Sequence, residues 1–313
     1  MRAISQHRHL LRPGKLLGLA AASSLFLSGC GVVAVTPTTT MPTQFSEAAG
    51  SLAAPLGTTP PSEGKPAPGR LPVYWLGLNG DNVFLYREFL PAESSSDPIV
   101  EAVMAMTAGS PLDPDYFNPW NKAGRVTASI SGKNIITVDI SSDAFKASLD
   151  AGIAHRAVQQ LVYTATAAAS NAGLTTVGHD PQVVLLVDGM AGYRAFGHEV
   201  LEGQLERDPA LMAPIWIIDP QEGSASQSAL TVHGTAVSEG GQLSWRAEPI
   251  VDGRPAEAAV QSGYAELQDP AGGTSLFSFT AELPPGEYKV SVFHGSGRQD
   301  EDSKRVTIHS PAQ

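Results

Sequence analysis

The stretch that decides the first fold is LPVYWLGLNGDNVFLY, residues 71–86. Its two apolar runs, 73–76 and 83–86, flank Asn79-Gly80-Asp81. Because Asn and Gly tolerate the positive φ angles that tight hairpin turns need, this pattern predicts a β-hairpin. We therefore expect regular structure to begin at residue 71.

The residues that follow extend this hairpin into an α+β domain. Asp97-Pro98, a short apolar run and Gly109 predict a helix with Asp at its N-cap and Gly at its end. Further along, residues 125–130 and 135–140 predict a second hairpin, 153–172 a longer helix, and 183–187 a buried strand. The predicted order is β-β-α-β-β-α-β, over residues 71–207.

From residue 214 the apolar residues alternate with a period of two, and helical signals disappear. Short strands separated by Gly and Pro turns are typical of an immunoglobulin-like sandwich, which we expect over residues 214–313 after a linker at 208–213. Tyr288, after Pro284-Pro285-Gly286, is placed where a tyrosine corner would close the sandwich. The candidate strands are 215–218, 229–236, 242–247, 263–267, 276–283, 288–293 and 305–309.

Residues 1–29 have the pattern of a lipoprotein signal peptide. Basic residues precede the apolar run 16–27, which is too short to span a bilayer. The run ends in Leu27-Ser28-Gly29-Cys30, which resembles the lipobox of bacterial lipoproteins, and Cys30 is the one cysteine in the chain. Stable anchoring takes more than one acyl chain, such as diacylglyceryl with palmitate. We expect cleavage before Cys30 and lipid anchoring on the extracytoplasmic face of the cell membrane.

Composition constrains the rest of the chain. Residues 30–70 are rich in Thr, Pro, Ser, Gly and Ala, too poor in large apolar residues to form a core, and predict a disordered stalk after the lipidated cysteine. The formal net charge is −11 for the whole chain, and removal of the basic signal peptide makes it more negative. Such an acidic chain argues against a nucleic-acid partner.

A family resemblance rests on motifs spread through the first domain. They are Tyr86-Arg87-Glu88-Phe89, Asp97-Pro98, PLDPDY at 111–116, and the segments 137–141, 160–164 and 186–189. In this order and spacing they resemble the GerMN domain, named for sporulation and spore-germination proteins. The later segments 217–220, 232–236 and 283–288 resemble the immunoglobulin-like domain that often follows GerMN. The resemblance implies an exported, non-enzymatic building block of the envelope.

The sequence lacks the motifs of nucleophilic hydrolases, phosphate-binding loops, dinucleotide-binding folds and zinc proteases. We therefore predict no catalytic residues, no metal ligands and no cofactor. The predicted function is a membrane-anchored, non-catalytic binding or scaffold module for envelope proteins or peptidoglycan. The alternative is an exported hydrolase or a small-ligand receptor.

The loop 111–120 is the candidate binding segment. Aromatic and carboxylate side chains together suit a protein anchor or a sugar-stacking platform, and binding residues concentrate in loops. The alternative is that the aromatic residues cap the hydrophobic end of the helix pair. The candidate binding residues are Asp113, Asp115, Tyr116, Phe117 and Trp120.

A second polar motif lies near the C-terminal end, at Asp300-Glu301-Asp302. Its carboxylates are ligands that calcium prefers, but three consecutive side chains cannot all face one ion. A solvated turn is therefore the favoured interpretation.

Overall fold

The computed structural model describes residues 69–93, 97–226, 229–238, 242–268, 273–295 and 298–310. The predicted signal peptide, Cys30 and all but the last two residues of the predicted stalk lie outside the described residues. Regular structure begins at Arg70, one residue before the predicted start.

The first hairpin is confirmed. Strand β1 (Arg70–Asn79) pairs antiparallel with β2 (Asn82–Pro91), and Asn79 lies opposite Asn82 across the turn. Gly80 has a φ of +59°, the left-handed conformation that glycine adopts at no steric cost. The other edge of β1 carries β3 (Tyr116–Phe117), a two-residue strand that the sequence pattern did not indicate.

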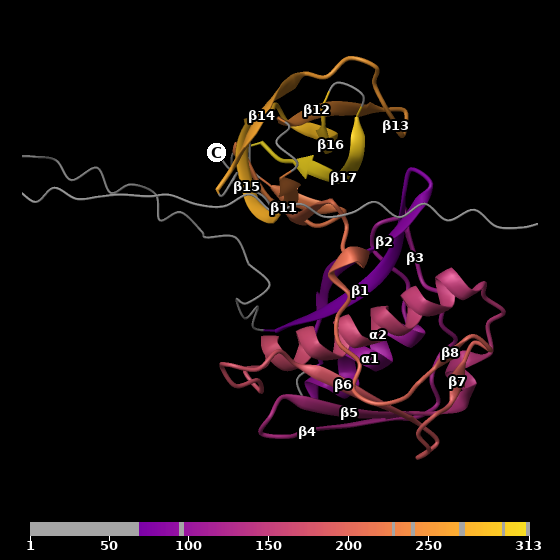
Figure 1. Cartoon of the computed structure of the whole chain (residues 1–313). Coiled ribbons are helices and arrows are strands. Elements are labelled where there is room, and N and C mark those ends of the chain that lie inside the picture. The colour runs from indigo at the N-terminus through magenta and orange to yellow at the C-terminus, as the bar shows by residue number, and fades with distance from the viewer. Residues whose placement is uncertain are drawn as a thin grey trace, which may run out of the picture. The chain divides into compact units, whose positions relative to one another are not determined.

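Two helices lie against this sheet (Figure 1). Helix α1 (Pro98–Ala108) begins as predicted, because the Asp97 side chain accepts hydrogen bonds from the backbone nitrogens of Ile99 and Val100. Helix α2 (Ala151–Asn171) is capped in the same way by Asp150. The two helices contact one another and strands of both three-stranded sheets of this domain, so most of the domain core lies around them.

The second sheet has the order β4-β5-β6, with β4 (Val126–Ile130), β5 (Ile135–Ile140) and β6 (Gln182–Val187). Strands β4 and β5 form the predicted antiparallel hairpin, and β6 runs parallel to β5 after the crossover through α2. Short elements complete the domain: η1 (Ser142–Phe145), β7 (Arg194–Ala195), β8 (Glu199–Val200) and η2 (Pro209–Leu211).

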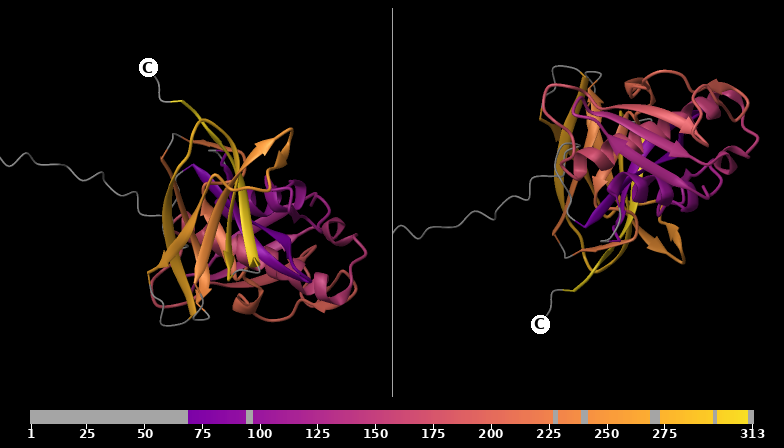
Figure 2. Two further views of the ribbon diagram at one scale, coloured as in Figure 1. Left: turned by 90° about the horizontal axis from the view of Figure 1, so that it is seen from above. Right: turned by 90° about the horizontal axis from the view of Figure 1, so that it is seen from below.

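The rest of the chain is an immunoglobulin-like sandwich of β-strands, as predicted. The strands follow the order β10-β17-β16-β12-β14-β15-β11-β9, with β13 paired to β12, and the sheet curls until β9 contacts β17 (Figure 2). Tyr288 forms the tyrosine corner, since its hydroxyl donates to the Pro284 carbonyl at 3.0 Å. The strands are β9 (Ile215–Asp219), β10 (Ser224–Ser226), β11 (Ala229–Ser238), β12 (Leu243–Val251), β13 (Arg254–Pro255), β14 (Gln261–Leu267), β15 (Gly273–Glu282), β16 (Gly286–His294) and β17 (Gln299–Ile308).

One strand boundary corrects the sequence interpretation. The last strand begins at Gln299 rather than at residue 305, so Asp300-Glu301-Asp302 lies within β17 and is not a solvated turn. Charged residues are rare in strands, so the sequence pattern did not predict the first half of β17 as a strand. Every second side chain of β17 faces the interior, so this boundary places Asp302 and Lys304 among the buried residues.

Strand β9 joins the two hydrophobic cores. Ile215 and Ile217 belong to the core of the sandwich, whereas Trp216 and Ile218 pack into the core of the α+β domain. The preceding segment is also packed, since Leu211 is buried and the Tyr163 hydroxyl donates to the Asp208 carbonyl at 2.9 Å. A boundary at 208–213 stays a prediction.

Candidate functional site

The loop 111–120 places its five candidate residues differently. Asp113, Tyr116 and Trp120 are buried, Phe117 is half-buried and Asp115 is exposed. Trp120 packs edge-on against the rings of Phe145 and Phe196, each at 5.0 Å between centroids. A partner approaching from solvent therefore has access to Asp115 and Phe117 rather than to the two largest aromatic side chains.

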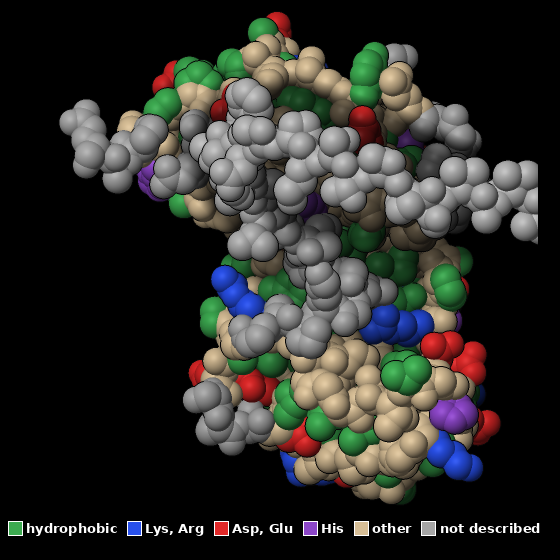
Figure 3. All heavy atoms as spheres, turned by 90° about the vertical axis from the view of Figure 1, so that its left-hand side faces the viewer, with side chains coloured by type: hydrophobic (Ala, Val, Ile, Leu, Met, Phe, Trp, Pro, Cys, Tyr) green, Lys and Arg blue, Asp and Glu red, His purple; other side chains and the backbone are tan. Residues whose placement is uncertain are grey.

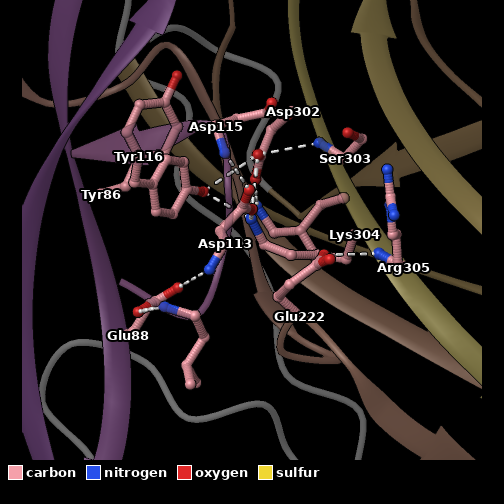
Figure 4. Close-up of polar contacts among 12 residues, drawn as sticks. Tyr86, Glu88, Asp113, Asp115, Tyr116, Glu222, Asp302, Ser303, Lys304 and Arg305 are labelled. Atoms are coloured by element: carbon pink, nitrogen blue, oxygen red, sulfur yellow. Dashed lines mark hydrogen bonds and ion pairs between the residues drawn. The ribbon is translucent and has the colours of Figure 1, made fainter. Parts of the chain in front are cut away.

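Asp113 and Tyr116 meet a buried lysine from β17 (Figure 4). The Lys304 ammonium lies 2.5 Å from Asp113 Oδ2, 2.6 Å from the Tyr116 hydroxyl and 3.2 Å from Asp302 Oδ1. Lys304, Asp113 and Asp302 expose only 3%, 2% and 5% of their surface. These four residues, which we call the Lys304 cluster, join the predicted binding loop to the acidic motif of β17.

The hydrogen bonds of the Lys304 cluster are satisfied on every side. Lysine has three N–H donors, and all three are used by Asp113, Tyr116 and Asp302. The Tyr116 hydroxyl accepts from Lys304 and donates to Asp302 Oδ1 at 3.2 Å. Asp302 Oδ2 accepts from the backbone nitrogen of Ile217 at 2.6 Å, which ties β17 to β9. Such complete pairing is what a buried charge requires to be stable.

Burial and charge shift the pKa values within the cluster. Burial raises the pKa of the Asp302 carboxyl, and the attraction of Lys304 offsets only part of this effect. Burial alone would lower the pKa of Lys304, but Asp302 and Asp113 outweigh it and the pKa is raised above the ordinary 10.5. Burial and the nearby Asp302 also raise the pKa of Tyr116. Lys304 is therefore held firmly in its charged form.

A second carboxylate, from β2, holds the backbone of the loop 111–120. Glu88 of β2 accepts hydrogen bonds from the backbone nitrogens of Leu112 and Asp113, both at 2.8 Å. Burial raises the pKa of Glu88, and these two hydrogen bonds lower it in part. The Tyr86 ring stacks on Tyr116 at 4.5 Å between centroids. Glu88 and Tyr86 both come from β2, so this strand holds the loop on the GerMN side and β17 contacts it from the sandwich.

Lys304 is the residue that sequence reasoning missed. The alternation of β17 contained the signal, because Val306 and Ile308 lie in the sandwich core and Asp302 and Lys304 continue the same face. A charged residue at a core-facing position needs a partner from another element. The sequence did contain that partner, in Asp113.

Two cavities border the loop. One of about 540 Å³ is lined by loop residues such as Phe117 and Asn118, and by flanking residues such as Thr107 and Lys122. The other, of about 350 Å³, lies between the β1–β2 turn and β17, and Asp115 and Glu301 line it. Within the described residues, no three His, Cys, Asp or Glu side chains gather as metal ligands would. On the face shown in Figure 3, the described Lys, Arg, Asp and Glu side chains are scattered among neutral ones.

Residues 72–191 match the Germane family model, described as sporulation and spore germination. The chain contains a GerMN domain. The GerMN domain is the α+β part of the structure, and the match includes β1 to β6 together with the loop of the Lys304 cluster. A search of curated proteins gave no significant match.

Solved structures include similar GerMN domains. The tandem GerMN domains of the sporulation protein GerM from Bacillus subtilis align with 18% identity and a TM-score of 0.33, over 44% of this chain and 45% of that chain. The chain therefore spans less than half the length of that tandem protein. The first GerMN domain of the same protein aligns with 15% identity and a TM-score of 0.34, over 44% of this chain and 98% of that chain. CopC from Methylosinus trichosporium OB3b aligns over 32% of this chain and 97% of that chain, with 18% identity and a TM-score of 0.23.

Proposed function

We propose that this protein is a non-catalytic binding or scaffold protein of the bacterial envelope, anchored by lipid on Cys30, in which the GerMN domain and the sandwich act as one rigid unit. The observation that carries the proposal is the Lys304 cluster. It uses a lysine of the sandwich and an aspartate of the GerMN domain, 2.5 Å apart, to hold the two domains together.

The Lys304 cluster would serve a scaffold by fixing the orientation of one domain relative to the other. A buried ion pair gains little net stability over an apolar contact, because its desolvation cost offsets the attraction between the charges. It does require one geometry, since a displaced partner would leave a charge buried and unpaired. A scaffold needs its binding surfaces at a fixed distance and angle, and the Lys304 cluster with the shared strand β9 supplies that constraint.

The same hydrogen bonds favour a structural role over a catalytic one. A lysine that acts as a general base or nucleophile must be a neutral amine, whose nitrogen has a free electron pair. Lys304 instead has a raised pKa and three acceptors around it. Its neighbour Tyr116 is buried with a raised pKa, so it too is held protonated.

The envelope position is supported by the sequence at Leu27-Ser28-Gly29-Cys30 and by the short apolar run before it. No helix within the described part of the chain combines the length and hydropathy needed to cross a bilayer. Lipid on Cys30 would hold the protein at the membrane surface, and residues 31–70 would separate the folded part from it.

The first test compares the full chain with Cys30→Ser in a bacterium that processes lipoproteins. We expect wild type to incorporate a fatty-acid analogue and to sediment with membranes, and Cys30→Ser to lose the label. Label retained by Cys30→Ser would overturn the anchoring.

The second test addresses the scaffold role. A photo-crosslinking residue at exposed Asp115 is compared with one at exposed Met190 of the same domain, in cells. We expect discrete envelope adducts that differ between the two positions and that are lost when Lys304→Met loosens the junction. Turnover of ester or glycoside substrates by the purified chain would contradict the non-catalytic assignment.

A further inference from the structure

The outer face of the sandwich carries a row of side chains that the GerMN match does not include. Ser244 of β12 lies directly opposite Tyr264 of β14 on one side and Phe293 of β16 on the other. Residues opposite one another in antiparallel strands point to the same face. Their inward neighbours Leu243, Trp245 and Val292 are buried in the core, so Tyr264, Ser244 and Phe293 point outward.

This row is unusual for a strand surface in water. Tyr264 exposes 65% of its surface, although it lies in the middle of β14. Phe293 is half-buried, and the Arg298 guanidinium lies 5.3 Å from its ring centre. With Ser244 between them, the backbone positions of Tyr264 and Phe293 lie two strand spacings apart, roughly 9.6 Å. That separation is close to the length of a disaccharide of β-1,4-linked pyranoses, in which alternate sugars present the same face.

The charges beside the row are paired. Arg246 lies 2.7 Å from Glu248, Lys289 lies 3.7 Å from Glu301, and Arg298 pairs with Glu301. The three basic side chains share two carboxylates, Glu248 and Glu301, so this group has a formal charge of only +1 and every charge in it is paired. Paired guanidinium and carboxylate groups still offer fixed hydrogen-bond donors and acceptors to uncharged hydroxyl and amide groups.

The paired side chains also lead into a cavity. Lys289, Arg298 and Glu301 line the 350 Å³ cavity together with Tyr86 and Asp115 of the GerMN domain. The surface therefore runs from the aromatic row across the ion pairs to the loop 111–120. An extended, uncharged polymer with apolar ring faces and polar edges fits this sequence of surfaces better than a compact ligand does.

We propose that this face binds a glycan strand of β-1,4-linked N-acetylhexosamines, with alternate sugars stacked on Tyr264 and Phe293 and the strand directed toward Asp115. The choice of glycan rests on the proposed function, because an envelope protein meets this polymer in peptidoglycan. The sandwich supplies the stacking surface, and the GerMN loop supplies the polar end of the site.

The test is isothermal titration of chitohexaose into the full chain in detergent, with Tyr264→Ala and Phe293→Leu as variants. We expect each variant to weaken binding by roughly tenfold, as expected for the loss of one aromatic contact. Met190→Ala is the matched control, since Met190 is also 65% exposed but lies in the GerMN domain, and it should bind as wild type. Urea unfolding checks that Tyr264→Ala and Phe293→Leu remain folded.

Co-sedimentation with purified peptidoglycan sacculi completes the experiment. We expect chitohexaose to compete with sacculi for wild type, and Tyr264→Ala to sediment less. Absence of chitohexaose binding by wild type, or unchanged binding by a folded Tyr264→Ala, would overturn the glycan site. Envelope crosslinks from Asp115 that persist in Tyr264→Ala would leave the scaffold proposal standing in that case, so the two failures are distinguishable.

Discussion

Replacing Lys304 by Met is the sharpest test of the junction between the GerMN domain and the sandwich. Methionine keeps most of the lysine volume and removes the charge. It leaves the Asp113 and Asp302 carboxylates buried without their shared cation. Breaking a buried ion pair by removing one partner costs about 3–5 kcal/mol, and a domain is stable by only about 5–15 kcal/mol. A large fraction of the stability should therefore be lost.

The structure indicates where within this range the loss should fall. Asp302 keeps the backbone nitrogens of Ile217 and Ser303 as donors, so part of its charge stays compensated. Asp113 keeps only a weaker arrangement, in which the backbone nitrogen of Asp115 donates to its other oxygen. We therefore expect about 3 kcal/mol, the lower end of the range.

The assay is urea unfolding followed by tryptophan fluorescence. Trp75, Trp120 and Trp216 lie in the core of the GerMN domain, whereas Trp245 lies in the sandwich. We expect wild type to unfold in one transition and Lys304→Met in two, because the two domains lose the buried ion pair that links them. Lys289→Met removes a half-buried lysine of the adjacent strand, which lies 3.7 Å from Glu301, and should change stability by no more than about 1 kcal/mol.

A triple variant distinguishes the stability lost through unpaired charges from the stability lost through the changed side-chain shape. Asp113→Asn and Asp302→Asn, added to Lys304→Met, remove the unpaired charges and keep oxygen acceptors for the backbone donors. Replacing every member of a buried ion pair is often close to neutral, so most of the lost stability should return. A loss below about 1 kcal/mol for Lys304→Met, or no recovery in the triple variant, would refute the argument that the charges hold this junction.

Three further outcomes follow from the same structure. Because the pKa of Lys304 is raised in the folded state, its stabilisation should be full below pH 10.5 and be lost as the pH rises through the higher folded-state pKa; urea midpoints against pH should show a shallower alkaline decline in Lys304→Met. Trp120→Ala should cost about 3–5 kcal/mol and lower the melting temperature sharply, whereas the neighbouring exposed Asp115→Ala should stay within about 0.5 kcal/mol. Tyr288→Phe, which loses only the hydrogen bond to the Pro284 carbonyl, should cost about 1 kcal/mol in urea unfolding, and no change would mean that water replaces this bond.

Local signals in the sequence were enough to predict most of the fold. The Asp97 cap, the Asn79-Gly80 turn and the alternation after residue 214 each depend on a few neighbouring residues, and the structure confirms the elements they predicted. The short strand β3 had no such signal. Its pairing with β1 depends on the position of the whole loop, which Glu88 of β2 holds from 24 residues away in the sequence.

The buried polar residues of α2 were also missed, because their role depends on contacts with another element. The apolar stripe of α2 predicted a helix packed on one side, but Gln160 and Thr164 are also buried. Gln160 donates to the Tyr74 carbonyl at 2.8 Å, and Thr164 accepts from the Tyr74 nitrogen at 3.1 Å. These side chains satisfy backbone groups of β1, and sequence periodicity contains no information about a backbone group in another element.

The Lys304 cluster shows both effects, a strand that local patterns did not predict in full and buried polar side chains that pair with another element. The sequence marked Asp113 and Tyr116 as one polar motif and Asp302 as another, and each was interpreted alone. Once β17 is seen to begin at Gln299, Lys304 falls on the core-facing side of a strand, where an unpaired ammonium would be prohibitively costly. Its partners must then come from another element, and a carboxylate-rich loop without a local explanation is the natural source. A charge at a core position and an unexplained acidic loop elsewhere in the chain therefore predict each other, and in this protein they meet in the 2.5 Å contact between Lys304 and Asp113.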